Sequence, residues 1–170
     1  MIWRQVLIIG TAILLAVLIE VTLLTRLGIP GATPDLVVVT VVAIALAMGP
    51  IQGAAAGFAA GALIDLAPPG DTLLGVNAVV YIAIGFITGL AVDPRDRTIP
   101  IMMGMTGLAT GAAVLLTAGL DTMLGSERVD WEQIPVLALT SALYGVLLAP
   151  GVILLIAWMV RKATPEVLVS

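Results

Sequence analysis

Residues 50–77 read PIQGAAAGFAAGALIDLAPPGDTLLGVN and join a helical pattern of small residues to a polar turn. Gly53, Gly57 and Gly61 recur every fourth residue, so on an α-helix they form a stripe that another helix can approach to backbone contact. The stripe ends four residues later in Asp65. A carboxylate near the end of a membrane helix reaches the headgroup layer, lines a wet cavity or finds a partner. We expect Asp65 to lie at the outer membrane surface.

The composition is that of an integral membrane protein. Of the 170 residues, 61% are hydrophobic and 11% are charged, with a mean hydropathy of +1.19, whereas soluble domains carry about 25% charged residues. The 7 Lys and Arg are outnumbered by 11 Asp and Glu, which argues against a nucleic-acid-binding protein. The sequence contains no Cys and no His, which excludes disulfides, thiolate chemistry and the ordinary zinc site. We expect no cofactor and no metal.

Apolar runs and the breakers between them predict an all-α, polytopic membrane protein with one transmembrane domain over residues 1–170. The six predicted spans are residues 6–24, 35–49, 50–66, 73–92, 99–120 and 134–160. The first run is too long for a signal peptide and no small-x-small cleavage site follows it, so we interpret it as a retained helix. Because spans 35–49 and 50–66 are short for a bilayer, they are either two short spans, which we favour, or a re-entrant hairpin. Pro150 predicts a kink in the last span.

Turn-forming residues mark the ends of the middle spans. Pro34 fits the first turn of the second span, with Thr33 as the candidate cap and Asp35 at the positive end of the helix dipole. Gly49 ends the second span, and Gly75 belongs to the turn that leads into the fourth. Together these residues predict tight connections in which consecutive helices lie antiparallel and nearly touch.

Four polar residues carry the candidate chemistry. Asn77 is a candidate hydrogen-bond partner of Asp65 across the turn that joins their helices. Glu20, the only charge in the first span, either reaches the membrane interface, which we favour, or finds a partner within the membrane. Asp35 and Asp65 come nearest to a catalytic carboxylate pair. Since no His, Cys or lysine within a span accompanies them, we do not expect an enzyme.

Basic residues in the short loops predict that both termini are cytoplasmic. The inside set would be Arg4, Arg95, Arg97, Arg161 and Lys162, and the outside set Arg26 and Arg128. Trp3 and Trp158 then fall at the inner boundary and Trp131 at the outer one, where indole rings are enriched. Asp71 and the acidic segment 121–132 share the outer face with Asp35 and Asp65.

The chain resembles the MreD family of rod shape-determining membrane proteins. The residues that carry the resemblance are Pro34-Asp35, Gly49, the run Gly53-x3-Gly57-Phe58-x2-Gly61-x-Leu63-x-Asp65, and Leu74-Gly75-x-Asn77-Ala78. The likeness is concentrated in residues 34–89, and the loop 68–71 is stiffer and more acidic than the family pattern. The resemblance implies a six-helix bundle similar to the substrate-binding S components of energy-coupling-factor vitamin transporters. It also implies a multi-pass protein of the bacterial inner membrane.

The function implied by the resemblance is that of a non-enzymatic scaffold of the cell-elongation complex. Such a protein pairs with the bitopic protein MreC and, with MreB filaments, RodA and a class B penicillin-binding protein, supports lateral peptidoglycan synthesis and cell shape. The residues expected to pack against the partner helix are Gly53, Gly57, Phe58 and Gly61, and those expected at the outer end of its groove are Asp35, Asp65 and Asn77. The alternative function is a vitamin-binding S component. The small number of aromatic residues, 3 Trp, 2 Tyr and 2 Phe, argues against it.

Overall fold

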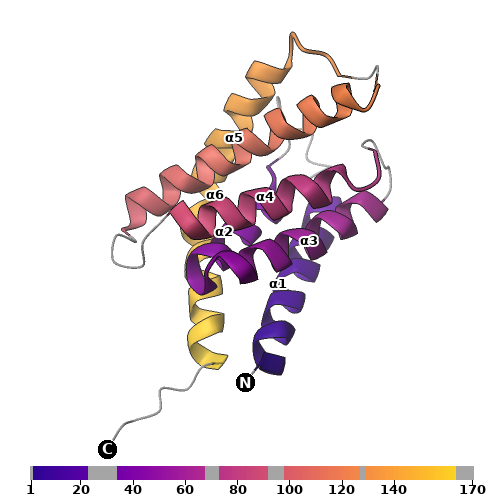
Figure 1. The fold of residues 1–170 in the computed structure, drawn as a ribbon. Coiled ribbons are helices and arrows are strands. Elements are labelled where there is room, and N and C mark those ends of the chain that lie inside the picture. The colour runs from indigo at the N-terminus through magenta and orange to yellow at the C-terminus, as the bar shows by residue number, and fades with distance from the viewer. Residues whose placement is uncertain (1, 23–33, 68–72, 92–97, 127–128, 164–170) are drawn as a thin grey trace, which may run out of the picture.

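Six α-helices make up the fold, and the described residues contain no β-strand (Figure 1). The computed structural model describes residues 2–22, 34–67, 73–91, 98–126 and 129–163. The helices are α1 Ile2–Thr22, α2 Leu36–Met48, α3 Pro50–Leu66, α4 Val76–Ala91, α5 Ile99–Met123 and α6 Ile134–Ala163. Each lies where a span is predicted. The predicted loops at 68–71 and 93–97, and the cap Thr33, lie outside the described residues.

Helix α2 is the centre of the molecule. Every residue from Val37 to Leu46 is buried, and α2 contacts each of the other five helices. A helix that is apolar on all sides has no face to present to water and belongs in a core. With 13 residues, α2 is about 20 Å long, shorter than the roughly 30 Å of a bilayer core. Its place in the centre explains its Val- and Ala-rich sequence.

The N-cap of α2 lies two residues after the predicted cap, Thr33. Asp35 is the N-cap, and its side chain accepts a hydrogen bond from the backbone N–H of Val38. Because the cap residue itself has a non-helical backbone, Pro34 lies before the helix and not in its first turn. At the other end Gly49, with φ +104°, ends α2 and directly precedes Pro50, the first residue of α3. The predicted role of Gly49 is confirmed.

Helices α3 and α4 form a closely packed antiparallel hairpin. A Cβ atom at Gly57 would overlap the backbone of Tyr81, and one at Gly61 would overlap the backbone of Ala78. Gly53 faces Gly85 in the same way. The glycine stripe is therefore filled by a helix of this chain. The prediction that Gly53, Gly57 and Gly61 receive a partner helix is wrong, because the backbone of α4 occupies that space.

Helices α5 and α6 form a second hairpin. Gly107 and Gly111 of α5 approach the backbone of α6 at Ala142 and Ala138, and a Cβ at Gly145 would overlap the side chain of Thr110. Gly104 of the same helix has open space around it. The sequence therefore indicates where close approach is allowed but does not show which glycines use it.

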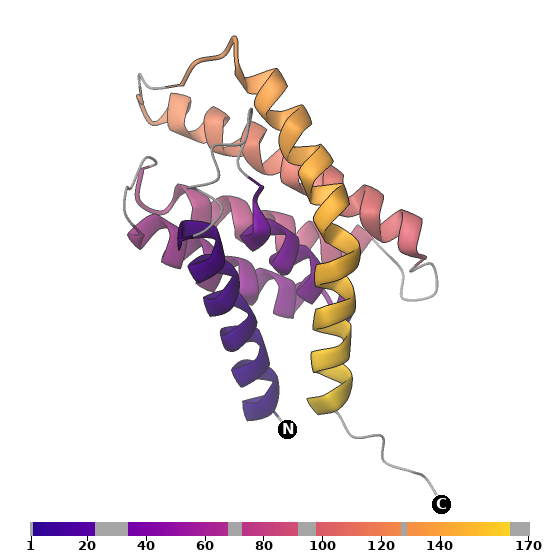
Figure 2. The same ribbon diagram turned by 180° about the vertical axis from the view of Figure 1, so that it is seen from behind.

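The α3–α4 hairpin does not run parallel to α1 or to the second half of α6. In Figures 1 and 2, α3 and α4 lie across the molecule, whereas α1 and the second half of α6 run along it. The beginning of α1 and the end of α6 lie at the same end, which brings Trp3 and Trp158 to that end, and the junction of α5 and α6 lies at the other. Helix α6 continues through Pro150 and changes direction along its length (Figure 2).

The outer surface is strongly apolar. Leu108, Leu139 and Leu147 are among many large hydrophobic side chains that are more than half exposed, an arrangement that suits lipid and not water. Two helices, α5 and α6, are long and apolar enough to cross a membrane, and the apolar parts of α1 to α4 are shorter.

Candidate functional site

Two carboxylates meet at the beginning of α2. Glu20, near the end of α1, accepts a hydrogen bond at Oε2 from the N–H of Val37 at 2.8 Å, and Asp35 accepts at Oδ1 from the N–H of Val38 at 2.8 Å. The first N–H groups of a helix have no partner within the helix, and the helix dipole favours negative charge there. Glu20 thus has a partner inside the protein, so the favoured interpretation, a side chain that reaches the interface, is wrong.

The beginning of α4 is held by a carboxylate of α3. Asp65 accepts from the N–H of Gly75 at 2.9 Å and from the N–H of Ala78 at 3.1 Å, both at Oδ2. Its Oδ1 accepts from the side-chain amide of Asn77 at 3.0 Å, which confirms the predicted pair. Gly75 has φ +94°, a conformation that favours glycine, so the predicted turn at this position is also confirmed. Asp65 joins the two helices of the hairpin at their connected end.

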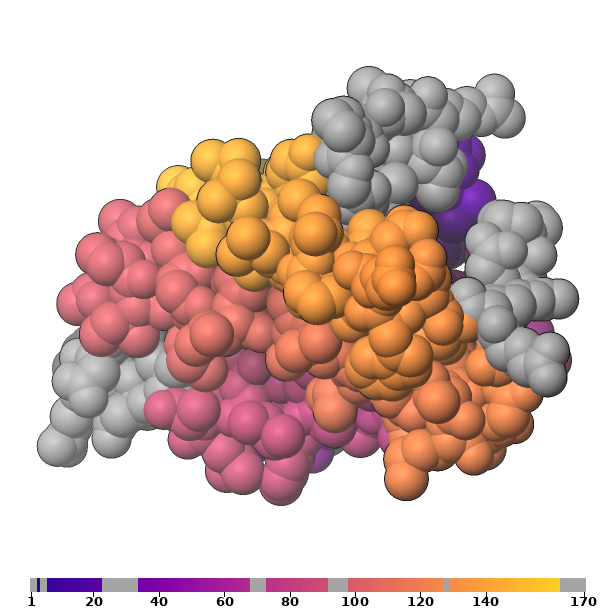
Figure 3. Space-filling view, turned by 90° about the horizontal axis from the view of Figure 1, so that it is seen from above, coloured from indigo at the N-terminus to yellow at the C-terminus, as the bar shows by residue number. Residues whose placement is uncertain are grey.

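A cavity of about 560 Å³ opens beside these caps, at the end of the molecule where α5 and α6 are joined. Figure 3 views the molecule from that end and shows the atoms of α5 and α6 over much of the face, with α4 beside them. The lining residues are Asp35, Asn77, Tyr81, Ala113, Val114, Thr117, Ala118, Asp121, Val129, Asp130, Gln133, Ile134 and Leu137. The cavity therefore has apolar walls and a set of polar groups drawn from four elements.

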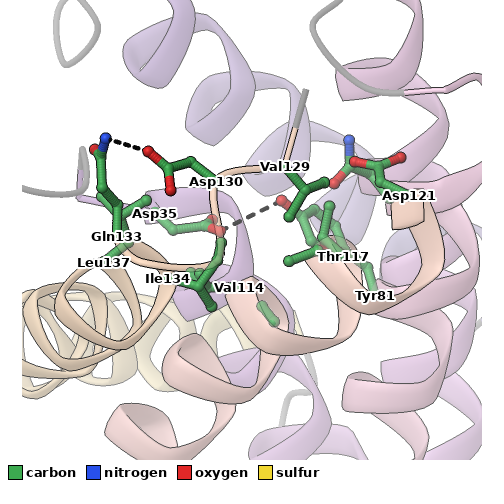
Figure 4. Close-up of a pocket in the computed structure, with 13 residues that line it drawn as sticks. Asp35, Tyr81, Val114, Thr117, Asp121, Val129, Asp130, Gln133, Ile134 and Leu137 are labelled. Carbon is green, nitrogen blue, oxygen red and sulfur yellow. Dashed lines mark hydrogen bonds between the residues drawn. The ribbon is translucent and has the colours of Figure 1, made fainter. Parts of the chain in front are cut away.

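The charged residues among those described in the cavity lining are all acidic: Asp35, Asp121 and Asp130. Tyr81 donates its hydroxyl hydrogen bond to Oδ2 of Asp35 at 3.3 Å, and the side-chain amide of Gln133 donates to Oδ2 of Asp130 at 2.7 Å (Figure 4). Asp121 is 7% exposed, and its Oδ1 has no hydrogen-bond partner among the described residues. No lysine or arginine is found among the lining residues that the structure describes. In the described part of the chain, no cluster of three or more acidic side chains is arranged to hold a metal ion.

The structure brings only some of the predicted site residues together. Asp35 and Asn77 line the cavity, and Asp65 is linked to it through Asn77. The glycine stripe lies apart, inside the α3–α4 interface. Phe58 is 58% exposed and points away from that interface. The four residues predicted as one contact surface therefore lie on two different faces of α3.

Tyr81 and Asp121 line the cavity but are not among the site residues predicted from the sequence. Tyr81 follows Asn77 by four residues, so both lie on one face of α4. The predicted fifth span ends at residue 120, which places Asp121 in the acidic segment after it. Helix α5 instead continues to Met123. Thr110, Thr117 and Asp121 are spaced along one face of a helix. Extending the helical pattern by one turn would have placed Asp121 on that face.

Comparisons of the chain with models of known protein families, with curated proteins and with solved structures give no match.

Proposed function

We propose that this chain is a non-enzymatic membrane scaffold of the MreD type, which acts in the bacterial cell-elongation complex through an MreC-like bitopic protein. The observation that supports it is that several residues of the resemblance, those of the glycine run and of the turn that follows Asp65, form one unit of structure. Gly57 and Gly61 seat α4 against α3, while Asp65 and Asn77 fix the connected end of the same hairpin. The motif therefore corresponds to a defined piece of architecture.

The hydrogen bonds of the Asp35 and Asp65 carboxylates are consistent with a scaffold function. Catalysis needs a group that is free to take or give a proton at a substrate. The carboxylates of Asp35 and Asp65 instead accept hydrogen bonds from backbone N–H groups at helix starts. Both residues therefore support the fold, and this structural use favours a non-enzymatic role for the pair.

We place the partner helix on the outward face of α3. Phe58 lies at the middle of that face and is 58% exposed, with Ile51 and Leu66 exposed toward its two ends. Ala55 and Ala59 beside Phe58 are also exposed, and small residues allow a second helix to come close. Phe58 is thus the residue of the predicted contact set that is accessible to a partner.

The proposed setting is the bacterial inner membrane, with six spans and both termini cytoplasmic. The lengths of α5 and α6 support membrane insertion. The beginning of α1, which carries Trp3, and the end of α6, which carries Trp158, lie at the same end, which supports two termini on one side of the membrane. Contact with MreB, RodA and a class B penicillin-binding protein would be indirect, through the MreC-like partner.

Co-purification tests this proposal. The tagged chain is expressed in a rod-shaped bacterium that lacks its own MreD, and two readouts are taken: recovery of rod shape, and the amount of MreC retained after mild detergent extraction. Wild type should restore rods and retain MreC. Phe58→Ala should reduce retained MreC about tenfold, because each tenfold loss of affinity corresponds to only about 1.4 kcal/mol of lost packing.

Leu90→Ala is the matched control, because Leu90 is a similarly exposed apolar residue of α4, at 61%. This variant should retain MreC at the wild-type level. Equal loss in both variants would show a general effect of surface truncation and would remove Phe58 from the proposed contact. Failure of wild type to retain MreC or restore rods would contradict the scaffold function itself.

The second candidate function is that of a substrate-binding S component. The cavity of about 560 Å³ favours it, since small-molecule sites typically enclose about 300–1,000 Å³ with a few convergent polar groups. Thermal stabilisation of the purified chain by a member of a vitamin panel would place this function ahead of the scaffold.

A further inference from the structure

The carboxyl group of Asp121 is in an unfavourable position in the absence of a ligand. Its side chain lies at the C-terminal end of α5, is 7% exposed and lines the cavity. Oδ1 has no hydrogen-bond partner among the described residues. Burying a polar atom without a partner is costly, and more so for a charged group. Its negative charge also lies at the end of the helix where the dipole disfavours it. Oδ1 of Asp121 can therefore accept a hydrogen bond from a donor that is not among the described residues.

The other groups of the cavity indicate which donor fits. Asp35 and Asp130 add two carboxyl groups to the lining, and no lysine or arginine among its described residues balances them. Ionised carboxylates only accept hydrogen bonds. A metal ion is disfavoured because the described acids do not form a cluster that could hold one. An ammonium or guanidinium group brings both positive charge and several N–H donors.

Part of the cavity wall is apolar. Val114, Ile134 and Leu137 line it together with the polar groups (Figure 4). This combination suits a ligand with a charged head and a small apolar body, because the body can contact the walls while the head reaches the carboxylates. The volume, about 560 Å³, is sufficient for a molecule of that kind.

We propose that the cavity between α4, α5 and the start of α6 binds an organic cation, with an ammonium or guanidinium head paired to Asp121 and an apolar body against Val114 and Leu137. The cation belongs either to a free small molecule or to a basic side chain of another protein. The site does not depend on the α3 face proposed for the partner helix, so either proposal can fail without the other.

Isothermal titration of the purified full-length chain in detergent tests the site. The probes are 2-phenylethylammonium, its neutral analogue 2-phenylethanol, and N-acetyl-lysine amide as the equivalent of a protein side chain. The ammonium probe should bind at least tenfold more tightly than the alcohol. If 2-phenylethylammonium binds more tightly than N-acetyl-lysine amide, the site is assigned to a small molecule. If N-acetyl-lysine amide binds more tightly, the site is assigned to a protein side chain. Equal binding of 2-phenylethylammonium and 2-phenylethanol would overturn the proposal.

Asp121→Asn tests the role of the carboxylate, because it keeps the size of the side chain and removes its charge. Binding of the ammonium probe should weaken at least tenfold. Glu132→Gln is the control, since Glu132 is an exposed acid of the α5–α6 connection that does not line the cavity, and it should bind like wild type. Unchanged affinity in Asp121→Asn, or equal losses in both variants, would overturn the proposal.

A second measurement separates binding from stability. Without a ligand, Asp121→Asn should unfold at the same temperature as wild type or at a higher one, because the substitution removes a buried charge that has no partner. A lower unfolding temperature would show that Asp121 stabilises the empty fold and would overturn its role as a counter-ion.

Arg128→Gln tests for an internal competitor, because Arg128 is the basic residue closest in sequence to Val129 and Asp130 of the lining. Wild type and Arg128→Gln should bind the probe equally, which supports a site that is open to an outside cation. Binding in Arg128→Gln alone would overturn the proposal, since the chain's own arginine would then hold the position.

Discussion

Three acidic side chains in this protein hold helix starts: Glu20, Asp35 and Asp65. Neither α2 nor α4 has an acidic residue in its own first turn, yet the first N–H groups of both need acceptors because they lie inside the fold. Asp35 and Glu20 serve α2, and Asp65 serves α4. Two of these three carboxylates come from a different helix, so each also links two elements. A carboxylate in an apolar sequence can therefore have a structural role without taking part in chemistry.

Replacing Asp65 by Ala should be strongly destabilising. The N–H groups of Gly75 and Ala78 would lose their acceptor, and an unsatisfied buried donor costs about 1–3 kcal/mol. We expect a loss of at least about 2 kcal/mol in unfolding free energy. Asn77→Ala, which removes one side-chain bond to the same carboxylate, should cost about 1 kcal/mol. Denaturant titration in detergent checks both values, and a smaller loss for Asp65→Ala than for Asn77→Ala would contradict the capping role.

At the scale of helices, the glycine pattern determines the pairing within the chain. The spacing of Gly53, Gly57 and Gly61 predicts a close helix contact, and the structure contains one. The sequence could not identify the helix that fills the stripe, because a bare surface is equally open to any helix. A short turn makes the next helix the nearest candidate. Packing of the next helix of the same chain against the stripe is therefore favoured over packing of a helix from another protein, because association of two molecules has an additional entropy cost.

Gly57→Ala and Gly104→Ala should have opposite effects on stability. A methyl group at Gly57 overlaps the backbone of Tyr81, which cannot move without separating α3 from α4, so we expect a loss of about 3 kcal/mol or more. Gly104 is helical with open space around it, so alanine there should be neutral or stabilising by up to about 1 kcal/mol. Thermal unfolding of both variants in the same detergent measures the difference. Equal stability would mean that the α3–α4 interface tolerates a wider spacing.

At the scale of the molecule, the sequence predicts the helices better than their arrangement. The six helices follow from apolar runs and from breakers such as Gly49, which act locally. The central position of α2 and the inclination of α3 and α4 depend on how several helices share space, and no local pattern encodes that. The cavity shows the same limit. The sequence marks Asp35 and Asn77 as candidate site residues because they are polar. That they line one cavity together with Asp121 of α5 depends on tertiary packing.

Membrane topology is the last property to test, and the absence of Cys from the sequence allows single cysteines to report on it. Glu132→Cys, Ile51→Cys and Lys162→Cys each introduce one thiol at an exposed position. A membrane-impermeant maleimide should label Glu132→Cys in intact cells, and Lys162→Cys only in inverted vesicles, if both termini are cytoplasmic.

Ile51 follows the turn at Gly49 and is 75% exposed. If α2 and α3 cross fully, Ile51→Cys should be labelled only in inverted vesicles. If they form a re-entrant hairpin, the thiol of Ile51→Cys lies inside the hydrocarbon core of the bilayer and should be labelled from neither side. The reagent does not enter lipid, and the reactive thiolate does not form there.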